Sequence, residues 1–340
     1  MSSVPLPMAP EPEADPVAVS RLQDEVRELA KQRDAIILAH NYQVPEIQDV
    51  ADYVGDSLGL SQQAAKVENA VIAFCGVHFM AETASILAPD KTVLLPDLDA
   101  GCSLADSITA EQLIEWQERF PEAVTVMYVN TTAAVKAVTD YCCTSSNAVA
   151  VVEHIVREHG PQTEICFGPD MFLGAYVQKV TGHERMRIWD GECHVHAGIR
   201  PDDITRVRGE HPGADFLIHP ECGCVTSVME YVAAGDVDSE GVKMLSTGGM
   251  MGYAAKAESE GAPRDVIVAT EVGMLYPLRK AAPDINFIPA NAEASCRYMK
   301  MITLEKLRDS LRDGTGEVKV AADVAERARV PIERMVAINP

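Results

Sequence analysis

Short apolar segments alternate with helix-length stretches along most of this chain, and that alternation limits its fold more than any other feature. Residues 108–120, 146–159 and 303–313 are examples of the helix-length stretches. Segments of strand length cover residues 35–40, 71–76, 92–97, 124–130, 163–168, 186–191, 215–220, 242–249, 265–270 and 284–290. Apolar runs of this kind are typical of parallel strands buried on both faces. The sequence therefore predicts an α/β fold with parallel sheets.

The ends of several predicted strands recur at a nearly constant interval. His40, Asn130 and His219 each close an apolar run, at intervals of 90 and 89 residues. A second series, one cysteine shortly after a later strand of each unit, has intervals of 91 and 103 residues: Cys102, Cys193 and Cys296. We therefore expect three like units. A pseudo-threefold axis would bring their strand ends, where open parallel sheets bind ligands, to one central point.

This periodicity predicts three αβα domains, over residues 21–108, 109–197 and 198–298. Residues 1–20 form a proline- and acid-rich segment with little large apolar surface, and we expect a disordered tail there. Residues 299–340 are expected to be a C-terminal helical segment that packs back on the core.

The chain is strongly acidic, with 51 acidic and 29 basic residues and a formal net charge of −22. Such a surface repels phosphate backbones and anionic lipid, so we expect neither a nucleic-acid nor a membrane partner. No apolar run approaches the roughly 20 residues that a membrane span needs, and the N-terminus lacks the features of a signal peptide. These observations predict a cytoplasmic protein.

Nine cysteines are spread along the chain, and without an export signal a disulfide framework is not expected. They can be buried apolar residues, a nucleophile or thiolate ligands of a soft metal. Three converging thiolates are unusual for a zinc enzyme, but they leave one iron of a cubane iron–sulfur cluster open. An open iron is a Lewis acid that can help to expel a hydroxyl group as water.

Eight ordered motifs between about residue 20 and residue 340 carry a family resemblance. They include AHNYQ, AGCSL, YVNTTAAVKA, WDGECHVH, HPEC, STGGMM and SCRYM, and they span residues 39–64, 74–106, 128–148, 167–177, 189–196, 219–222, 246–251 and 295–307. In these motifs the chain resembles the quinolinate synthase family. The resemblance implies a condensing enzyme of NAD biosynthesis that joins iminoaspartate and dihydroxyacetone phosphate to give quinolinate, phosphate and two waters. It also implies one [4Fe-4S] cluster per chain, three αβα domains about a pseudo-threefold axis, and transient contact with aspartate oxidase.

Carried over residue by residue, the resemblance gives Cys102, Cys193 and Cys296 as cluster ligands. The catalytic set that it implies, also in contact with substrate, comprises four titratable residues at the ends of predicted strands. Glu221 and Tyr42 resemble the proton-transfer pair of that set, and the other two members are His40 and His219.

Further substrate contacts are expected from the corresponding places in the three units. Tyr128 and Asn130 occupy the strand end of the second unit. Ser57, Ser145 and Thr247 stand between a strand and a helix, where unpaired amide groups and the helix dipole favour phosphate or carboxylate. Hydroxyl residues at such places are also ordinary helix caps.

Two other functions remain open from the residues alone. His194 and His196 form an H-x-H pair that is compatible with a metal hydrolase on a (β/α)8 barrel, and a non-catalytic cluster-dependent regulator is the second alternative. Cys222 and Cys224 are expected to be packing residues or an adventitious metal site. Whether the adjacent Cys142 and Cys143 form a regulatory disulfide stays open, and the C-x-x-C-x-x-C run of some relatives is absent at Cys296.

Overall fold

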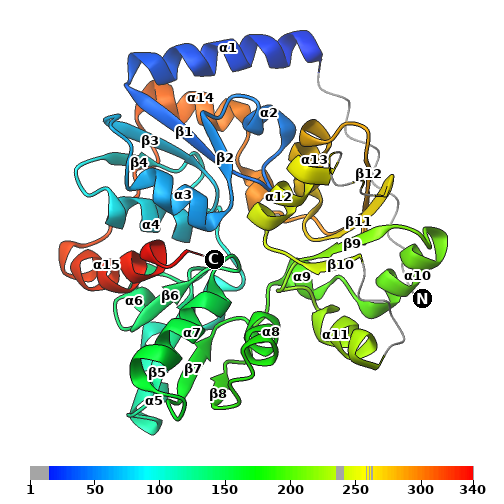
Figure 1. Ribbon diagram of the computed structural model, residues 1–340. Coiled ribbons are helices and arrows are strands. Elements are labelled where there is room, and N and C mark those ends of the chain that lie inside the picture. Colours follow the sequence, from blue (N-terminus) through cyan, green and yellow to red (C-terminus); the bar gives the residue numbers. More distant parts are fainter. Residues whose placement is uncertain (1–14, 235–240, 258, 260, 262, 340) are drawn as a thin grey trace, which may run out of the picture.

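The structure is a computed structural model that describes residues 15–234, 241–257, 259, 261 and 263–339. It contains three four-stranded sheets, and every strand pair in them is parallel (Figure 1). The predicted α/β fold with parallel sheets is therefore confirmed. The strands of the described residues form three separate sheets rather than the single barrel expected for the metal hydrolase. Across the described ranges, none of the helices has the length and apolar character to cross a membrane.

The first sheet has the strand order β2-β1-β3-β4. Its strands are β1 (Ala35–His40), β2 (Tyr53–Gly55), β3 (Val71–Cys75) and β4 (Thr92–Leu94). The helices of this part are α1 (Pro16–Gln32), α2 (Pro45–Gln48), α3 (Ser57–Ala64), α4 (His78–Leu87) and the 3₁₀ turn η1 (Ala105–Ser107).

The second sheet repeats this order as β6-β5-β7-β8. Its strands are β5 (Val124–Tyr128), β6 (Tyr141–Cys143), β7 (Ile165–Gly168) and β8 (Met186–Ile188). The helices that accompany them are α5 (Ala110–Arg119), α6 (Ala133–Lys136), α7 (Ala148–His159), α8 (Met171–Thr181) and α9 (His194–Ala197).

The third sheet has the order β10-β9-β11-β12, which is the same again. Its strands are β9 (Asp215–Ile218), β10 (Val242–Met244), β11 (Asp265–Ala269) and β12 (Asn286–Pro289). Its helices are α10 (Pro201–Glu210), α11 (Val225–Ala234), α12 (Thr247–Ala257), η2 (Val272–Met274) and α13 (Leu275–Ala281). The expectation of three like units is thus confirmed by strand order, and each predicted domain range contains one sheet.

Two edge strands and several strand ends differ from the sequence prediction. The strands β2 and β6 were not predicted; each is three residues long and hydrogen-bonds to a neighbour on one side only. Residues 245–249 were predicted as strand, but Thr247 already begins helix α12. Short edge strands carry too few residues for a periodic signal, which explains the omissions.

The two ends of the described chain pack on the first two units. Helix α1 begins at Pro16, so the predicted disordered tail is wrong for residues 16–20; residues 1–14 lie outside the described part. The Asp15 side chain caps this helix by accepting from the Val17 N–H at 3.0 Å, and proline suits its first position. At the other end, η3 (Met299–Met301) leads into α14 (Leu304–Asp313), which packs on α1, and α15 (Ala322–Ala337) packs on α6, β6 and α4 (Figure 1).

The central strands are buried on both faces, as their apolar runs predict. All four residues of β7 are buried, and Phe167 is fully enclosed there. Four cysteines are free, buried and part of the strands, namely Cys75, Cys142, Cys143 and Cys166. Burial raises the pKa of each of these thiols, which keeps them protonated. This environment fits buried apolar residues, one of the roles that the sequence allows for its cysteines, and Cys142 and Cys143 are not joined to each other.

Candidate active site

One cavity collects side chains from the carboxyl ends of all three sheets. Every residue that the sequence analysis placed in the site lines it: His40, Tyr42, Ser57, Cys102, Tyr128, Asn130, Ser145, Cys193, His219, Glu221, Thr247 and Cys296. The reason is the repeated topology. His40 ends β1, Tyr128 ends β5 and His219 follows β9 directly, so equivalent strand positions supply equivalent corners of the cavity.

The three predicted ligand cysteines reach the cavity from loops. Cys102 lies between β4 and η1, Cys193 immediately precedes α9, and Cys296 lies between β12 and η3. All three are free and only partly buried. Burial raises the pKa of the Cys102 thiol, and the nearby Cys193 and Cys296 raise it further, so the three sulfurs lie within range of one another's charge. Three free thiols that face one cavity from three units are a donor set that fits an iron–sulfur cluster.

A smaller group in the same cavity could hold a single ion. The ligand atoms of Cys193, His196 and Glu221 all lie within 4.8 Å of one another. Cys193 therefore belongs to both sets of donors. A four-iron cluster is larger than a single ion and spreads its thiolates further apart, so the two sets represent different metal chemistry.

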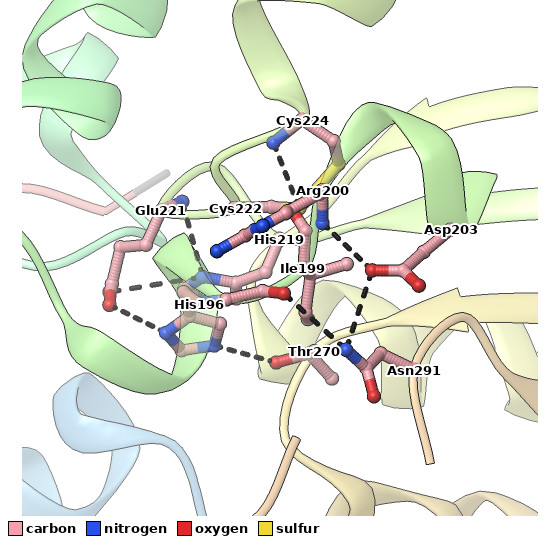
Figure 2. Close-up of a disulfide and its surroundings, with 11 residues drawn as sticks. His196, Ile199, Arg200, Asp203, His219, Glu221, Cys222, Cys224, Thr270 and Asn291 are labelled. Carbon is pink, nitrogen blue, oxygen red and sulfur yellow. Dashed lines mark hydrogen bonds and ion pairs between the residues drawn. A yellow bond between two sulfur atoms is a disulfide. The ribbon is translucent and has the colours of Figure 1, made fainter. Parts of the chain in front are cut away.

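Glu221 is the centre of a buried network, and Figure 2 shows its contacts with His196 and His219. Its carboxylate accepts from the Tyr128 hydroxyl and lies 3.1 Å from His196 Nδ1 and 3.8 Å from His219 Nδ1. Burial favours the protonated acid, but His219, His196 and the Tyr128 hydroxyl outweigh that effect and lower the pKa of Glu221 to about 2. Burial lowers the pKa of His196, but Tyr42, Cys193 and Glu221 outweigh burial, and the pKa of His196 lies well above its usual range. His196 and Glu221 therefore favour the imidazolium–carboxylate pair.

Tyr42 does not contact Glu221 directly, although the two were predicted as a proton-transfer pair. The Tyr42 hydroxyl lies 2.6 Å from Thr270 Oγ1 and 3.2 Å from His196 Nε2. The His196 ring thus stands between Glu221 and Tyr42, with one nitrogen toward each. Thr270 also lies 3.0 Å from His196 Nε2 and holds that ring edge (Figure 2).

Sequence reasoning missed His196 and Thr270 as members of this site. His196 entered it only as half of the H-x-H pair, and its partner His194 also lines the cavity but contacts Ser103, with Nδ1 2.6 Å from Ser103 Oγ. The available signal was the position of His196 in α9, three residues after Cys193, which directly precedes that helix. Thr270 follows β11 directly, at a strand end that no prediction used.

The two histidines at the matching strand ends are held neutral. Burial is the main cause that lowers the pKa of His40 to about 3 and of His219 to about 3. Burial also raises the pKa of Tyr42, so its phenol stays protonated at neutral pH. Neutral imidazoles and phenols can donate a hydrogen bond to a bound carboxylate.

The predicted hydroxyl contacts stand at the starts of helices. Ser57 and Thr247 are the first residues of α3 and α12, and Thr247 Oγ1 accepts from Asn41 Nδ2 at 3.1 Å. Ser145 precedes α7, and its Oγ lies 3.2 Å from His219 Nε2. Three such helix N-termini facing one cavity form a setting for anionic groups.

Cys222 and Cys224 pack in the apolar core, as one of the two predicted roles requires, but they also form a disulfide that the sequence did not predict and that leaves no thiolate for an adventitious metal. The bond lies in the turn that follows Glu221, between β9 and α11 (Figure 2). Both residues are fully buried. In this form neither sulfur is a thiolate. The cysteines that are free and partly exposed are Cys102, Cys193 and Cys296.

Comparison with known proteins gives one consistent family. The family described as "Quinolinate synthetase A protein" matches residues 24–337. A quinolinate synthase of Mycobacterium sp. (strain KMS) is 57% identical over 315 residues, which cover 93% of this chain and 91% of that protein. Those of Mycolicibacterium paratuberculosis and Mycobacterium tuberculosis (strain ATCC 25177 / H37Ra) are 56% and 54% identical over 93% of this chain and 88% of each relative. This chain therefore belongs to the quinolinate synthase family.

Proposed function

We propose that the chain is an enzyme of NAD biosynthesis that condenses iminoaspartate with dihydroxyacetone phosphate to give quinolinate, with loss of phosphate and two waters. The observation that supports this most is the meeting of Cys102, Cys193 and Cys296, one from each unit, with the strand-end acid–base residues in a single cavity. Membership of the family supplies the identity of the substrates.

The proposal gives the chain one [4Fe-4S] cluster, held by Cys102, Cys193 and Cys296. When bound, a cluster with three thiolate ligands supplies an iron with an open coordination position, which acts as a Lewis acid toward an oxygen that leaves as water. The chain's own residues provide the other requirements, which are to bind two anionic substrates, to exclude water and to move protons.

Substrate binding is assigned to neutral groups. His40, His219 and Asn130 can donate to carboxylates, and the helix starts at Ser57, Ser145 and Thr247 can receive phosphate or carboxylate. Among the described residues that line the cavity there is no Lys or Arg. Anion recognition therefore rests on oriented dipoles and hydroxyl groups.

Proton transfer is assigned to Glu221, His196 and Tyr42. Glu221 is ionised at neutral pH and can accept a proton, because its pKa lies at about 2. His196 Nδ1 and Nε2 face Glu221 and Tyr42, so the ring can pass a proton between the carboxylate and the phenol. This relay replaces the direct Glu221–Tyr42 pair.

Two measurements on anaerobically purified protein test the proposal: iron and sulfide content, and quinolinate formed from dihydroxyacetone phosphate and iminoaspartate generated from oxaloacetate and ammonia. We expect about four irons and four sulfides per chain, with quinolinate formation. Cys102→Ser, Cys193→Ser and Cys296→Ser should each lose iron and turnover. Cys75→Ser and Cys166→Ser are matched controls and should keep both, since these thiols are buried within strands. Full iron content and normal turnover in Cys296→Ser would refute the ligand assignment.

The same measurement separates the single-ion site from the cluster. Zinc or another lone metal without sulfide would favour the Cys193–His196–Glu221 group as the metal site and would contradict the cluster. The proposal also places the enzyme in the cytoplasm, in transient contact with the aspartate oxidase that supplies the unstable imine. Co-purification of oxidase activity with the chain tests that contact.

A further inference from the structure

Glu271 is a fully buried carboxylate in the cavity wall that neither the sequence prediction nor the proposed proton relay uses. It follows β11, and its side chain accepts the Cys296 N–H at 2.9 Å and the Gly273 N–H at 2.7 Å. Its Oε1 also lies 2.9 Å from Lys300 Nζ, and 0% of the Glu271 side chain is exposed. A buried carboxylate is tolerated only with such partners, so its position is tightly determined.

Lys300 extends this contact to the first unit. Its ammonium group donates to the backbone carbonyl of Tyr42. The backbone N–H of Lys300 donates to the Cys296 carbonyl at 3.2 Å. Glu271 and Lys300 therefore meet at one point where the segment with Cys296 and the segment with Tyr42 are both anchored. Residues far apart in sequence are fixed relative to each other by this pair.

The residue before Glu271 contacts the hydroxyl end of Tyr42. Thr270 Oγ1 lies 2.6 Å from the Tyr42 hydroxyl, while Glu271 is connected to the Tyr42 carbonyl through Lys300. Two consecutive residues directly after β11 thus fix the positions of both the phenol and the backbone of Tyr42. Gly273 completes the arrangement, since a Cβ there would lie 2.6 Å from the Tyr42 carbonyl oxygen.

We propose that Glu271 and Lys300 are positioning residues that fix the Cys296 loop against the Tyr42 segment, so that the third cysteine and the phenol keep one relative geometry. The inference rests on the proposed function, because that function gives Cys296 and Tyr42 their roles. Neither Glu271 nor Lys300 is assigned a ligand or a proton of its own.

The contacts of Glu271 and Lys300 that join the Cys296 loop to the Tyr42 segment are called the brace below. Hydrogen exchange on the metal-free full chain, followed by mass spectrometry of its peptides, tests the brace without iron and without an activity assay. In Glu271→Gln we expect peptides that contain Cys296 and Tyr42 to exchange about tenfold faster or more, with the remaining peptides unchanged. Lys300→Met should likewise make the peptide that contains Tyr42 exchange faster. Lys300→Arg keeps the charge, so this peptide should stay as protected as in the unsubstituted chain. If Lys300→Met does not fold, the double variant Glu271→Gln/Lys300→Met removes both charges together and is measured instead.

Lys280→Met is the matched control. Lys280 Nζ lies 2.8 Å from Asp49 Oδ1 and also joins the third unit to the first, but neither residue lines the cavity. This control should leave both peptides and turnover unchanged. In the cluster-containing enzyme, Glu271→Gln should lower kcat about tenfold or more with a KM change below about threefold. Lys300→Arg should keep at least half of the turnover of the unsubstituted enzyme.

Unchanged exchange at both peptides in Glu271→Gln would overturn the brace, and so would faster exchange spread evenly over all peptides, which indicates a general loss of stability. Wild-type chain that binds no cluster and forms no quinolinate would refute the proposed function instead, while the exchange data would still decide the brace.

Discussion

Replacing Glu221 by glutamine removes one proton-accepting group from the cavity and changes little else in shape. In the structure the carboxylate is 3% exposed, lies 3.1 Å from His196 Nδ1 and accepts from the Tyr128 hydroxyl. Its pKa of about 2 keeps it ionised at neutral pH, when it can take up a proton from a bound substrate. Glutamine keeps an oxygen for Tyr128 but cannot take up that proton.

The expected loss follows from the role proposed for the carboxylate, which is that of a general base. Such catalysis contributes about 10²–10⁴-fold, so turnover should fall by about 10²-fold or more, which corresponds to about 2.7 kcal/mol in the activation free energy. The variant also leaves His196 without its charged partner. Because His196 can release its proton, we expect the free energy of unfolding to fall by only about 1–3 kcal/mol, and the iron content to stay normal.

Steady-state formation of quinolinate, iron analysis and thermal unfolding on the same preparation separate these effects. Glu153→Gln makes the same chemical change at an exposed position of α7 and should alter none of the three readings. Unchanged turnover in Glu221→Gln would remove Glu221 from the mechanism. A chain that unfolds or loses its iron would show that the carboxylate is structural.

Four further predictions concern protonation, packing, the disulfide and charge. His40 has a folded pKa of about 3 against 6.5 in the unfolded chain, so its contribution to stability is complete above pH 6.5 and is lost as the pH falls toward 3. Between about pH 7 and pH 5.5 this group should therefore lower the free energy of unfolding of the metal-free chain by about 1.3 kcal/mol. Denaturant titrations at the two pH values measure that loss, and His40→Asn should remove it. Phe167→Ala empties a fully enclosed site in β7 and should lower the free energy of unfolding by about 3–5 kcal/mol, whereas a loss below about 1 kcal/mol would contradict the tight packing of that sheet. Cys222→Ser and Cys224→Ser should keep full iron content, since neither residue lines the cavity, and iron loss in either would reopen their role as ligands. Raising the ionic strength from about 0.05 to about 0.3 M should not raise the KM of either substrate more than about twofold, because anion binding is proposed to rest on buried dipoles rather than on exposed cations. A tenfold rise would indicate a basic binding surface.

The fold was predictable where long runs of apolar residues carry the signal. The central strands, such as β1, β5 and β9, are buried on both faces and appear in the sequence as uninterrupted apolar segments. The strands β2 and β6 were missed because tertiary pairing, rather than a pattern of their own, makes three residues extend. The start of α1 was missed despite a signal, since Asp15 before Pro16 is a standard helix-start pair.

The site was predictable to the extent that its residues share a place in each unit. Strand ends repeat along the chain, and therefore His40, Asn130 and His219 can be grouped by their spacing alone. Contacts between units have no such signature: Thr270 is separated from His196 by 74 residues and from Tyr42 by 228. Which residues touch across the centre depends on how three sheets dock, and one chain's sequence does not record that docking.

The division into three units also resolves a conflict between the charge of the chain and that of its proposed substrates. With a net charge of −22, the surface repels anions, and the described cavity lining holds no Lys or Arg. A site buried between three units can instead direct several helix starts inward, because each parallel sheet places its loops and helix N-termini at the same edge. Burial then keeps His40 and His219 neutral, so that they donate hydrogen bonds without adding charge. The same burial strengthens every dipole that faces a bound anion, since little water remains to screen it. An acidic protein can thereby bind anionic molecules, provided that the residues of the three units are held in register, and Glu271 and Lys300 are assigned that role between the Cys296 loop of the third unit and the Tyr42 segment of the first.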